Sequence, residues 1–138
     1  EPERKMSKSD EEDSFVAVLD APDVIRRKFK RAVTDSPAEV RYDPENQPGV
    51  SNLLAILSAT SGTDIETLVN EMAGYGTLKE RTAEAVIERL KPLQAEYARL
   101  MKDKVYLNEV LKDNAQRASA LAQRTLRKLY KKIGLYQL

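Results

Sequence analysis

The sequence predicts an all-α fold, a helical bundle of about five or six helices. Apolar residues recur with the 3.6-residue period of an amphipathic helix through most of the chain, and strand-like alternation is almost absent. Proline, glycine and capping residues divide these stretches at intervals that suit helices. Ahead of the bundle, residues 1–13 are polar and lack apolar periodicity. We therefore expect a mobile, exposed loop there, followed over residues 15–19 by a short apolar run that forms one strand or an extended segment.

The first half of the bundle begins at Asp20, the predicted N-cap of a helix that has Pro22 in its first turn. Gly62 suits the C′ position that ends the second helix. Two capping-box sequences, TDIE at residues 63–66 and TLKE at 77–80, predict the next two helix starts. The expected elements are a helix over residues 20–33, a proline-rich loop over 34–48, a helix over 49–61, and helices that start near 64 and 78.

The second half of the bundle begins with this last helix, which keeps the helical period of apolar residues to about residue 101. Asp103 then caps a short helix that ends near Leu111, and a final helix over residues 113–133 ends at Gly134. We expect the final helix to bury one stripe whose small residues let a neighbouring helix approach closely. That stripe consists of Ala115, Ala118, Ala122, Thr125, Leu129 and Ile133.

The composition restricts the chemistry of this chain. Its 138 residues fit one domain with a modest core. It contains no cysteine and no histidine, which excludes a disulfide framework, a thiolate metal site and a histidine general base. We expect no metal site. No apolar run approaches the ~20 residues of a membrane span, and the charged N-terminus is unlike a signal peptide. We therefore expect a soluble, cytoplasmic protein without a membrane partner.

Charge is unevenly distributed along the chain. The formal net charge is +1, yet residues 114–138 carry six basic side chains and no acidic one. A basic terminal helix in an otherwise slightly acidic domain indicates a polyanionic partner such as nucleic acid. A solvated helix face, with cations favoured near the C-terminal end of the helix dipole, explains the same pattern. Charge alone leaves both interpretations open.

The string KMSKSD at residues 5–10 carries the clearest chemical signal. Lys5 and Lys8 lie three residues apart on an exposed segment and can clamp a polyphosphate, because each ammonium is a compact charge on a flexible stem. The hydroxyl groups of Ser7 and Ser9 can add hydrogen bonds to phosphate oxygens. A given pentapeptide is expected by chance on the order of once in 10⁴ or more chains of this length, so the match is specific.

KMSKS resembles the ATP-loop signature of class I aminoacyl-tRNA synthetases, and the rest of the chain narrows the resemblance. In order and over essentially its whole length, the chain is similar to the C-terminal third of bacterial tryptophanyl-tRNA synthetases. The strings that carry the resemblance are AVTDS at 32–36, RYD at 41–43, PGVSNLL at 48–54, GYG at 74–76, AEAVIERLKPLQ at 83–94 and IGL at 133–135. The chain departs from the family at Gln47, where lysine is frequent, at Leu78 and at Asn114.

This resemblance implies an enzyme that joins tryptophan to ATP as tryptophanyl-adenylate and then transfers tryptophan to tRNA(Trp). Residues 1–13 would be the ATP-binding KMSKS loop at the end of a Rossmann-like catalytic domain that is otherwise absent. Within that loop, Lys5 and Lys8 would be the catalytic residues, holding the pyrophosphate of magnesium-bound ATP. Residues 5–9 (Lys5, Met6, Ser7, Lys8 and Ser9) would bind ATP.

The same resemblance implies that residues 14–138 form the α-helical domain that binds the tRNA anticodon. Basic side chains of the final helix would contact the RNA, namely Arg117, Arg124, Arg127 and Lys128. The parent enzyme would be a homodimer, while the chain alone would be inactive and monomeric. Two alternatives stand against this interpretation: a freestanding helical RNA-binding module without catalysis, and a generic helical interaction domain. The intact KMSKS loop argues against the first, and the extended match argues against the second.

Overall fold

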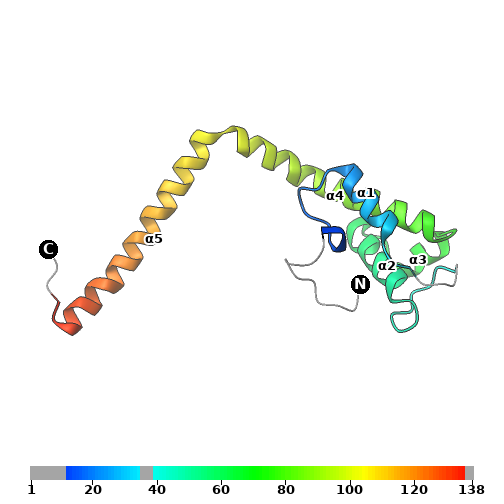
Figure 1. The fold of residues 1–138 in the computed structure, drawn as a ribbon, viewed down its shortest axis with the longest axis horizontal. Coiled ribbons are helices and arrows are strands. Elements are labelled where there is room, and N and C mark those ends of the chain that lie inside the picture. The colour runs from blue at the N-terminus through cyan, green and yellow to red at the C-terminus, as the bar shows by residue number, and fades with distance from the viewer. Residues whose placement is uncertain (1–11, 35–38, 136–138) are drawn as a thin grey trace. The chain divides into compact units, whose positions relative to one another are not determined.

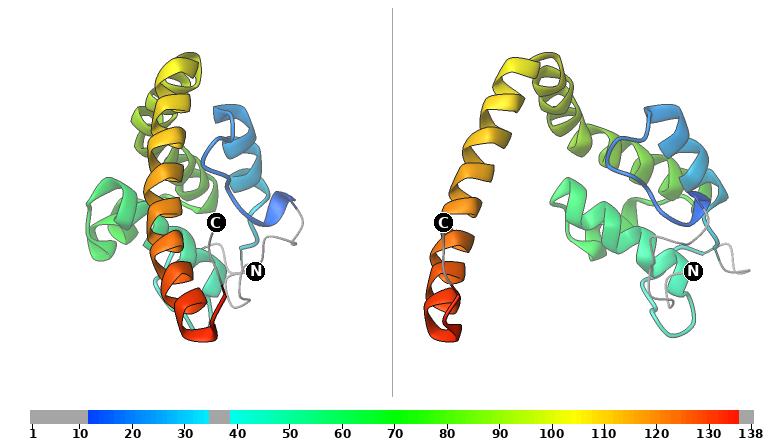
Figure 2. Two further views of the ribbon diagram at one scale, coloured as in Figure 1. Left: turned by 90° about the vertical axis from the view of Figure 1, so that its left-hand side faces the viewer. Right: turned by 60° about the vertical axis from the view of Figure 1, so that its left-hand side comes forward.

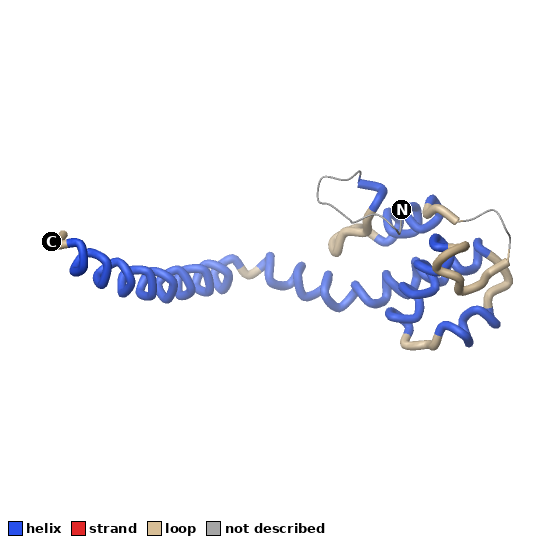
Figure 3. The backbone as a smooth tube through the Cα atoms, turned by 90° about the horizontal axis from the view of Figure 1, so that it is seen from below, coloured by secondary structure: helices blue, strands red, loops and turns tan. Residues whose placement is uncertain are grey.

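The structure is a computed structural model that describes residues 12–34 and 39–135. In chain order, its elements are η1, a 3₁₀ turn, Glu12–Ser14; α1 Pro22–Arg31; α2 Pro48–Ser61; α3 Ile65–Glu71; α4 Tyr75–Lys102; and α5 Lys104–Ile133. The described residues contain helices and loops without any strand (Figures 1 and 3). The predicted all-α fold is thus confirmed. Residues 15–19 belong to no helix.

The chain divides into two compact units, Glu1–Gln94 and Ala95–Leu138, with the boundary inside α4. The first unit holds an apolar core between α1, α2, α3 and the first half of α4. The most completely buried aliphatic side chains are Ile25, Val50, Leu54, Leu57, Leu68 and Leu78. α1 lies beside α4 (Figures 1 and 2), and Arg26 Nε of α1 meets Glu84 Oε1 of α4 at 2.6 Å.

Proline and glycine mark the helix ends in the first unit. Pro22 lies in the first turn of α1 as predicted, whereas Pro48, expected as the last residue of the loop, is the first residue of α2. At both positions the missing N–H removes no intrahelical hydrogen bond. Gly62 ends α2 in the left-handed conformation, with φ of 76°. The predicted start of the fourth helix at the capping box of residues 77–80 is wrong by one turn, because α4 already begins at Tyr75.

Two predicted N-caps are corrected by one residue. Ala21, rather than Asp20, is the N-cap of α1, and it makes no side-chain capping bond. The carboxylate of Asp20 instead accepts a hydrogen bond from the Lys28 ammonium. At α3 the capping residue is Asp64 rather than Thr63, because Asp64 Oδ1 accepts from Thr67 N at 2.8 Å. Asp20 thus pairs with a charged donor, whereas Asp64 caps its helix through the backbone N–H of Thr67.

Gly49 marks a close backbone approach in the first unit. It lies in the first turn of α2, and a β-carbon built there would collide with the backbone carbonyl of Val33. Glycine therefore allows α2 to start directly against the segment that follows α1. This approach brings α2 under the loop that leads out of α1.

The second unit differs from the prediction in two ways. The expected short helix and the expected final helix form one helix, α5, because no proline or glycine interrupts residues 104–133 (Figure 2). Asp103 caps it as predicted, accepting from Tyr106 N at 3.0 Å, and Gly134 ends it with φ of 73°. The expected buried stripe is wrong within the described residues, since α5 buries none of its side chains. Leu129 and Ile133 are 48% and 57% exposed.

None of the helices in the described part of the chain is both long enough and apolar enough to cross a membrane.

Candidate functional site

The predicted ATP-loop residues Lys5, Met6, Ser7, Lys8 and Ser9 lie outside the described residues, so their site stays a prediction. The described part of the chain begins three residues after Ser9, with η1 and then residues 15–20, which lead into α1. We call residues 15–20 the connector. Its attachments decide how firmly the end of the predicted loop is held on the helical body.

The connector is held to α1 by a buried charge. The ammonium Nζ of Lys28 donates to Asp20 Oδ2 at 2.8 Å, and the two side chains are only 3% and 13% exposed. The same carboxylate oxygen accepts from the backbone N–H of Ala17 at 2.9 Å. The Lys28 ammonium also lies 5.1 Å from the centre of the Phe15 ring, which suits a cation–π contact. Lys28 therefore contacts the connector at both ends.

These contacts set the charge state of Asp20. Burial by itself would raise the pKa of the Asp20 carboxyl, because a low-dielectric surrounding disfavours the charged form. The hydrogen bonds from Lys28 and from the Ala17 N–H outweigh burial and hold the pKa of Asp20 below its ordinary value. Asp20 is consequently a carboxylate at neutral pH and serves as the counter-charge of Lys28.

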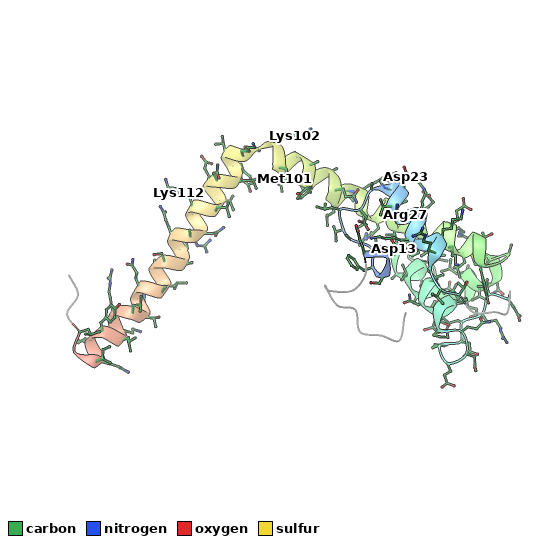
Figure 4. The ribbon with its side chains drawn as sticks, viewed as in Figure 1. Asp13, Asp23, Arg27, Met101, Lys102 and Lys112 are labelled. Carbon is green, nitrogen blue, oxygen red and sulfur yellow. The ribbon has the colours of Figure 1, made fainter. Side chains whose placement is uncertain are left out.

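Two further contacts fix the connector and the turn before it. Gln94 of α4 donates its side-chain amide to the carbonyl oxygens of Val18 and Asp20, at 2.9 and 3.1 Å. Arg31 Nη1 of α1 reaches Asp13 Oδ2 of η1 at 2.7 Å; Figure 4 labels Asp13 on that turn. The chain leading from the predicted loop is thus bound by side chains of two different helices.

An apolar cleft of about 520 Å³ lies under the connector. The connector, α1, α2 and α4 all contribute to its walls. Its lining is mostly apolar and includes Phe15, Val16, Phe29, Leu53, Ile56 and Leu90. Apolar side chains of the connector line this cleft, while its polar groups form hydrogen bonds with α1 and α4. Apolar packing and hydrogen bonds therefore hold the same short segment.

The four predicted RNA-binding residues all lie exposed on α5. At 3.6 residues per turn, Arg117, Arg124 and Lys128 fall within about 40° of arc, and Lys131 extends this basic face to about 60°. Arg127 projects about 80° away from Arg117, so the helix brings together three of the four. The basic face runs about 21 Å along the helix from Arg117 to Lys131. Such a row of cations suits a phosphate backbone.

No cluster of three carboxylates among the described residues is arranged to hold a metal ion. Gln47, which stands where the family often has lysine, is 1% exposed and donates to the carbonyl of Glu39 at 3.3 Å. Its amide is therefore enclosed in the core and serves the loop before α2.

Sequence reasoning did not single out Lys28 as a buried residue that binds the connector. It stands in the basic run RRKFKR and looks like one more solvated cation. The available signal is its spacing, because Lys28 falls on the same helix face as Ile25, Phe29 and Ala32. A lysine on the apolar face of a helix needs a buried partner, and Asp20, eight residues earlier, is that partner.

Comparisons with known proteins agree with this arrangement. A family model described as tRNA synthetases class I (W and Y) matches residues 1–91. The chain is 46% identical over 137 residues to a tryptophan–tRNA ligase of Clostridium tetani, covering 97% of this chain and 40% of that protein. It is 47% identical over 138 residues to tryptophan–tRNA ligase 1 of Streptomyces avermitilis, covering 99% of this chain and 42% of that protein.

A solved structure is similar over the same extent. The crystal structure of tryptophanyl-tRNA synthetase from Mycoplasma pneumoniae matches with a TM-score of 0.68 and 28% identity, covering 99% of this chain and 44% of that one. The chain therefore spans well under half the length of the relatives it matches. Because the family model covers more than half of the present sequence, this chain belongs to the class I tRNA synthetases (W and Y).

Proposed function

We propose that this chain is the C-terminal part of a cytoplasmic, homodimeric tryptophan–tRNA ligase. The parent enzyme activates tryptophan with ATP and transfers it to tRNA(Trp). The observation that carries this proposal is the 43–47% identity, over nearly the whole chain, to relatives that bear the name tryptophan–tRNA ligase. The pocket for tryptophan and the glycines that cradle the nucleotide would belong to a catalytic domain outside this sequence.

Within that enzyme, Lys5 and Lys8 act as an electrostatic clamp. Activation moves negative charge onto the departing pyrophosphate, and two ammonium groups that meet this charge lower the barrier. Met6, Ser7 and Ser9 complete the ATP loop, and Mg²⁺ arrives bound to ATP. No nucleophile or proton-transfer residue is required from this segment, because the chemistry depends on positioning and charge.

The helical part binds the anticodon end of tRNA(Trp) through the basic face of α5. Support comes from the exposure of Arg117, Arg124 and Lys128 on one side of a 30-residue helix. Phosphate contacts of this kind hold and orient an RNA, whereas base identity is read by other contacts.

The test of the clamp is tryptophan-dependent ATP–pyrophosphate exchange, measured on this chain alone and mixed with a purified catalytic domain of the family. We expect exchange only in the mixture. Lys8→Ala should then lower the exchange rate by about 10²–10³-fold, the usual effect of deleting one transition-state donor, while tRNA affinity is kept. A Lys8→Ala variant with unchanged exchange would contradict the clamp.

The test of RNA binding is the salt dependence of affinity for a tRNA(Trp) transcript. Replacing Arg124 and Lys128 by glutamine should flatten the slope of log K against log salt by about 1.4, since each phosphate contact contributes about 0.7. Lys112→Gln is the matched control, because Lys112 (labelled on α5 in Figure 4) lies about 130° from the centre of the basic face. Tight RNA binding without any exchange in the mixture would favour the freestanding RNA-binding module.

A further inference from the structure

Side chains of α1 and α4 bind the connector between the predicted ATP loop and α1. A connector of this length could join the two without such contacts. Six residues separate Lys8 from Phe15, so their Cα atoms can lie up to about 25 Å apart in an extended chain. Phe15, at the start of the connector, is the root from which the chain leads back to the predicted loop. The position of the root therefore decides how often the loop lysines meet the reacting phosphates.

Lys28 fixes that root. Its ammonium binds Asp20 at the end of the connector and lies over the ring of Phe15 at the beginning. Lys28 itself cannot serve as a phosphate ligand in this arrangement, because its side chain is 3% exposed and its charge is already neutralised by Asp20. An isolated surface lysine would have no reason to be enclosed in this way.

An ion pair, rather than an apolar contact, holds Asp20 to α1. Taking two charges out of water is expensive, and an apolar pair of similar volume would often stabilise a core equally well. A buried pair instead specifies one partner and one register. An apolar side chain would favour no single polar partner, whereas the Lys28 ammonium donates to the carboxylate of Asp20 at 2.8 Å.

Gln94 of α4 holds the connector in the same position. Its amide donates to two carbonyl oxygens of the connector, Val18 O and Asp20 O. Asp20 is therefore held by its side chain from α1 and by its backbone from α4. The connector is fixed to a rigid pair of helices rather than to one of them.

We propose that Lys28 is a positioning residue for amino-acid activation: by holding Asp20 and Phe15 it fixes the connector on the helical body and keeps Lys5 and Lys8 aligned with the reacting phosphates. This inference rests on the proposed clamp function of those two lysines. In this proposal Lys28, a buried residue of α1, affects the rate of amino-acid activation through Lys5 and Lys8, which lie outside the described part of the chain.

The experiment is tryptophan-dependent ATP–pyrophosphate exchange by the full-length synthetase, with kcat and KM determined for ATP and tryptophan. Lys28→Met keeps an unbranched side chain that is shorter by one heavy atom, and it removes the charge. We expect kcat to fall by about 10- to 100-fold, the effect of small misplacements of reacting groups, with the KM for tryptophan unchanged. Lys28→Arg, which restores the charge, should recover most of the rate.

Arg26→Met is the matched control. Arg26 stands on the same helix and pairs with Glu84 of α4 at 2.6 Å, but this pair is about half exposed and does not touch the connector. Its loss should change kcat by less than about twofold, in line with the small contribution of exposed ion pairs. Equal losses for Arg26→Met and Lys28→Met would mean that general loosening of α1 causes the effect, and would overturn the positioning role.

A double variant separates positioning from structure. If Lys28 acts through the loop, Lys28→Met should lower kcat by less than about threefold when Lys8→Ala is already present, because coupled residues are not additive. A full additional loss in that background would overturn the inference. Unchanged exchange in Lys8→Ala alone would instead overturn the clamp function, whereas a slow Lys8→Ala beside a normal Lys28→Met would overturn only the role of Lys28.

Hydrogen exchange tests the same proposal through the structure instead of the activity. Hydrogen exchange of the Ala17 amide, which donates to Asp20, should accelerate in Lys28→Met while the amides of α2 stay protected. Unchanged protection of Ala17 would contradict the proposal. Should Lys28→Met fail to fold, Asp20→Asn offers the same test, because it removes the counter-charge and keeps an acceptor for the Ala17 N–H.

Discussion

Both units of this chain have apolar residues at the helical period, but only the first unit buries them. Among the described residues, the buried apolar side chains all belong to the first unit, from Ile25 to Ile87. α5 has an equally regular apolar stripe, yet all of its described residues stay at least partly exposed. Periodicity thus identifies which face of a helix is apolar, and burial depends on a second element that covers it.

The largest expected effect comes from truncating the core of the first unit. Leu54 is fully buried, so Leu54→Ala should lower the free energy of unfolding by about 3 kcal/mol, from lost burial and the cavity left behind. Leu111 of α5 is 67% exposed, so Leu111→Ala should change the free energy of unfolding by less than about 0.5 kcal/mol. Urea unfolding followed by circular dichroism measures both. A large, concentration-dependent loss for Leu111→Ala would show that a second copy covers α5.

Gly49 offers a test of backbone packing in the same unit. Gly49→Ala should destabilise the first unit by about 1–3 kcal/mol, because the new methyl group meets the carbonyl of Val33. Gly76 in the first turn of α4 is the control, since a β-carbon there has no neighbour within 4 Å. Gly76→Ala should be neutral or slightly stabilising, as alanine favours a helix. Equal effects in thermal unfolding would disprove the close approach.

Acid should weaken the first unit through Asp20. The pKa of this carboxyl is lower in the folded chain than its ordinary value of 3.8. Asp20 therefore stabilises the fold above that ordinary value, and the contribution is lost as the pH falls through the lower, folded pKa. Urea midpoints between pH 6 and pH 2.5 should fall more steeply for the parent chain than for Asp20→Asn. Parallel curves would exclude Asp20 as a source of the acid sensitivity.

The smallest expected effect concerns the helix caps. Asp64→Ala and Asp103→Ala each remove an N-cap worth about 1 kcal/mol. The first lies in a packed unit, so its loss should lower the global unfolding midpoint. The second begins α5, so its loss should appear as local fraying, with faster hydrogen exchange at Tyr106 and an unchanged midpoint. A shift of the global midpoint by Asp103→Ala would mean that α5 unfolds together with the first unit.

Much of the fold follows from local signals in the sequence. Pro22 and Pro48 mark helix starts because proline has a fixed φ and lacks an N–H. Gly62 and Gly134 mark helix ends because glycine adopts the left-handed conformation without a steric penalty. The predicted break near Asp113 is wrong, because a residue with weak helix propensity does not end a helix that has no proline or glycine to stop it.

The site is harder to predict, since it depends on partners that are distant in the chain. Gln94 reaches the connector across 74 to 76 residues of sequence, and no local pattern predicts such a contact. Lys28 is hard to distinguish from the neighbouring cations for the same reason, although its position on the face of Ile25 and Phe29 is a usable signal. The roles of Lys5 and Lys8 come from family resemblance, which the described residues do not test.

The enclosed ammonium of Lys28 has a consequence for lysine chemistry. Acylation needs an amine that a reagent can reach, and the amine of Lys28 is paired with Asp20 and 3% exposed. Lys128 and Lys131 on α5 are open to the same reagents. Acetylation would therefore erase charge along α5 first and leave the connector attached. A mild acylating reagent followed by mass spectrometry would read out this order directly, with Lys28 among the last amines to react.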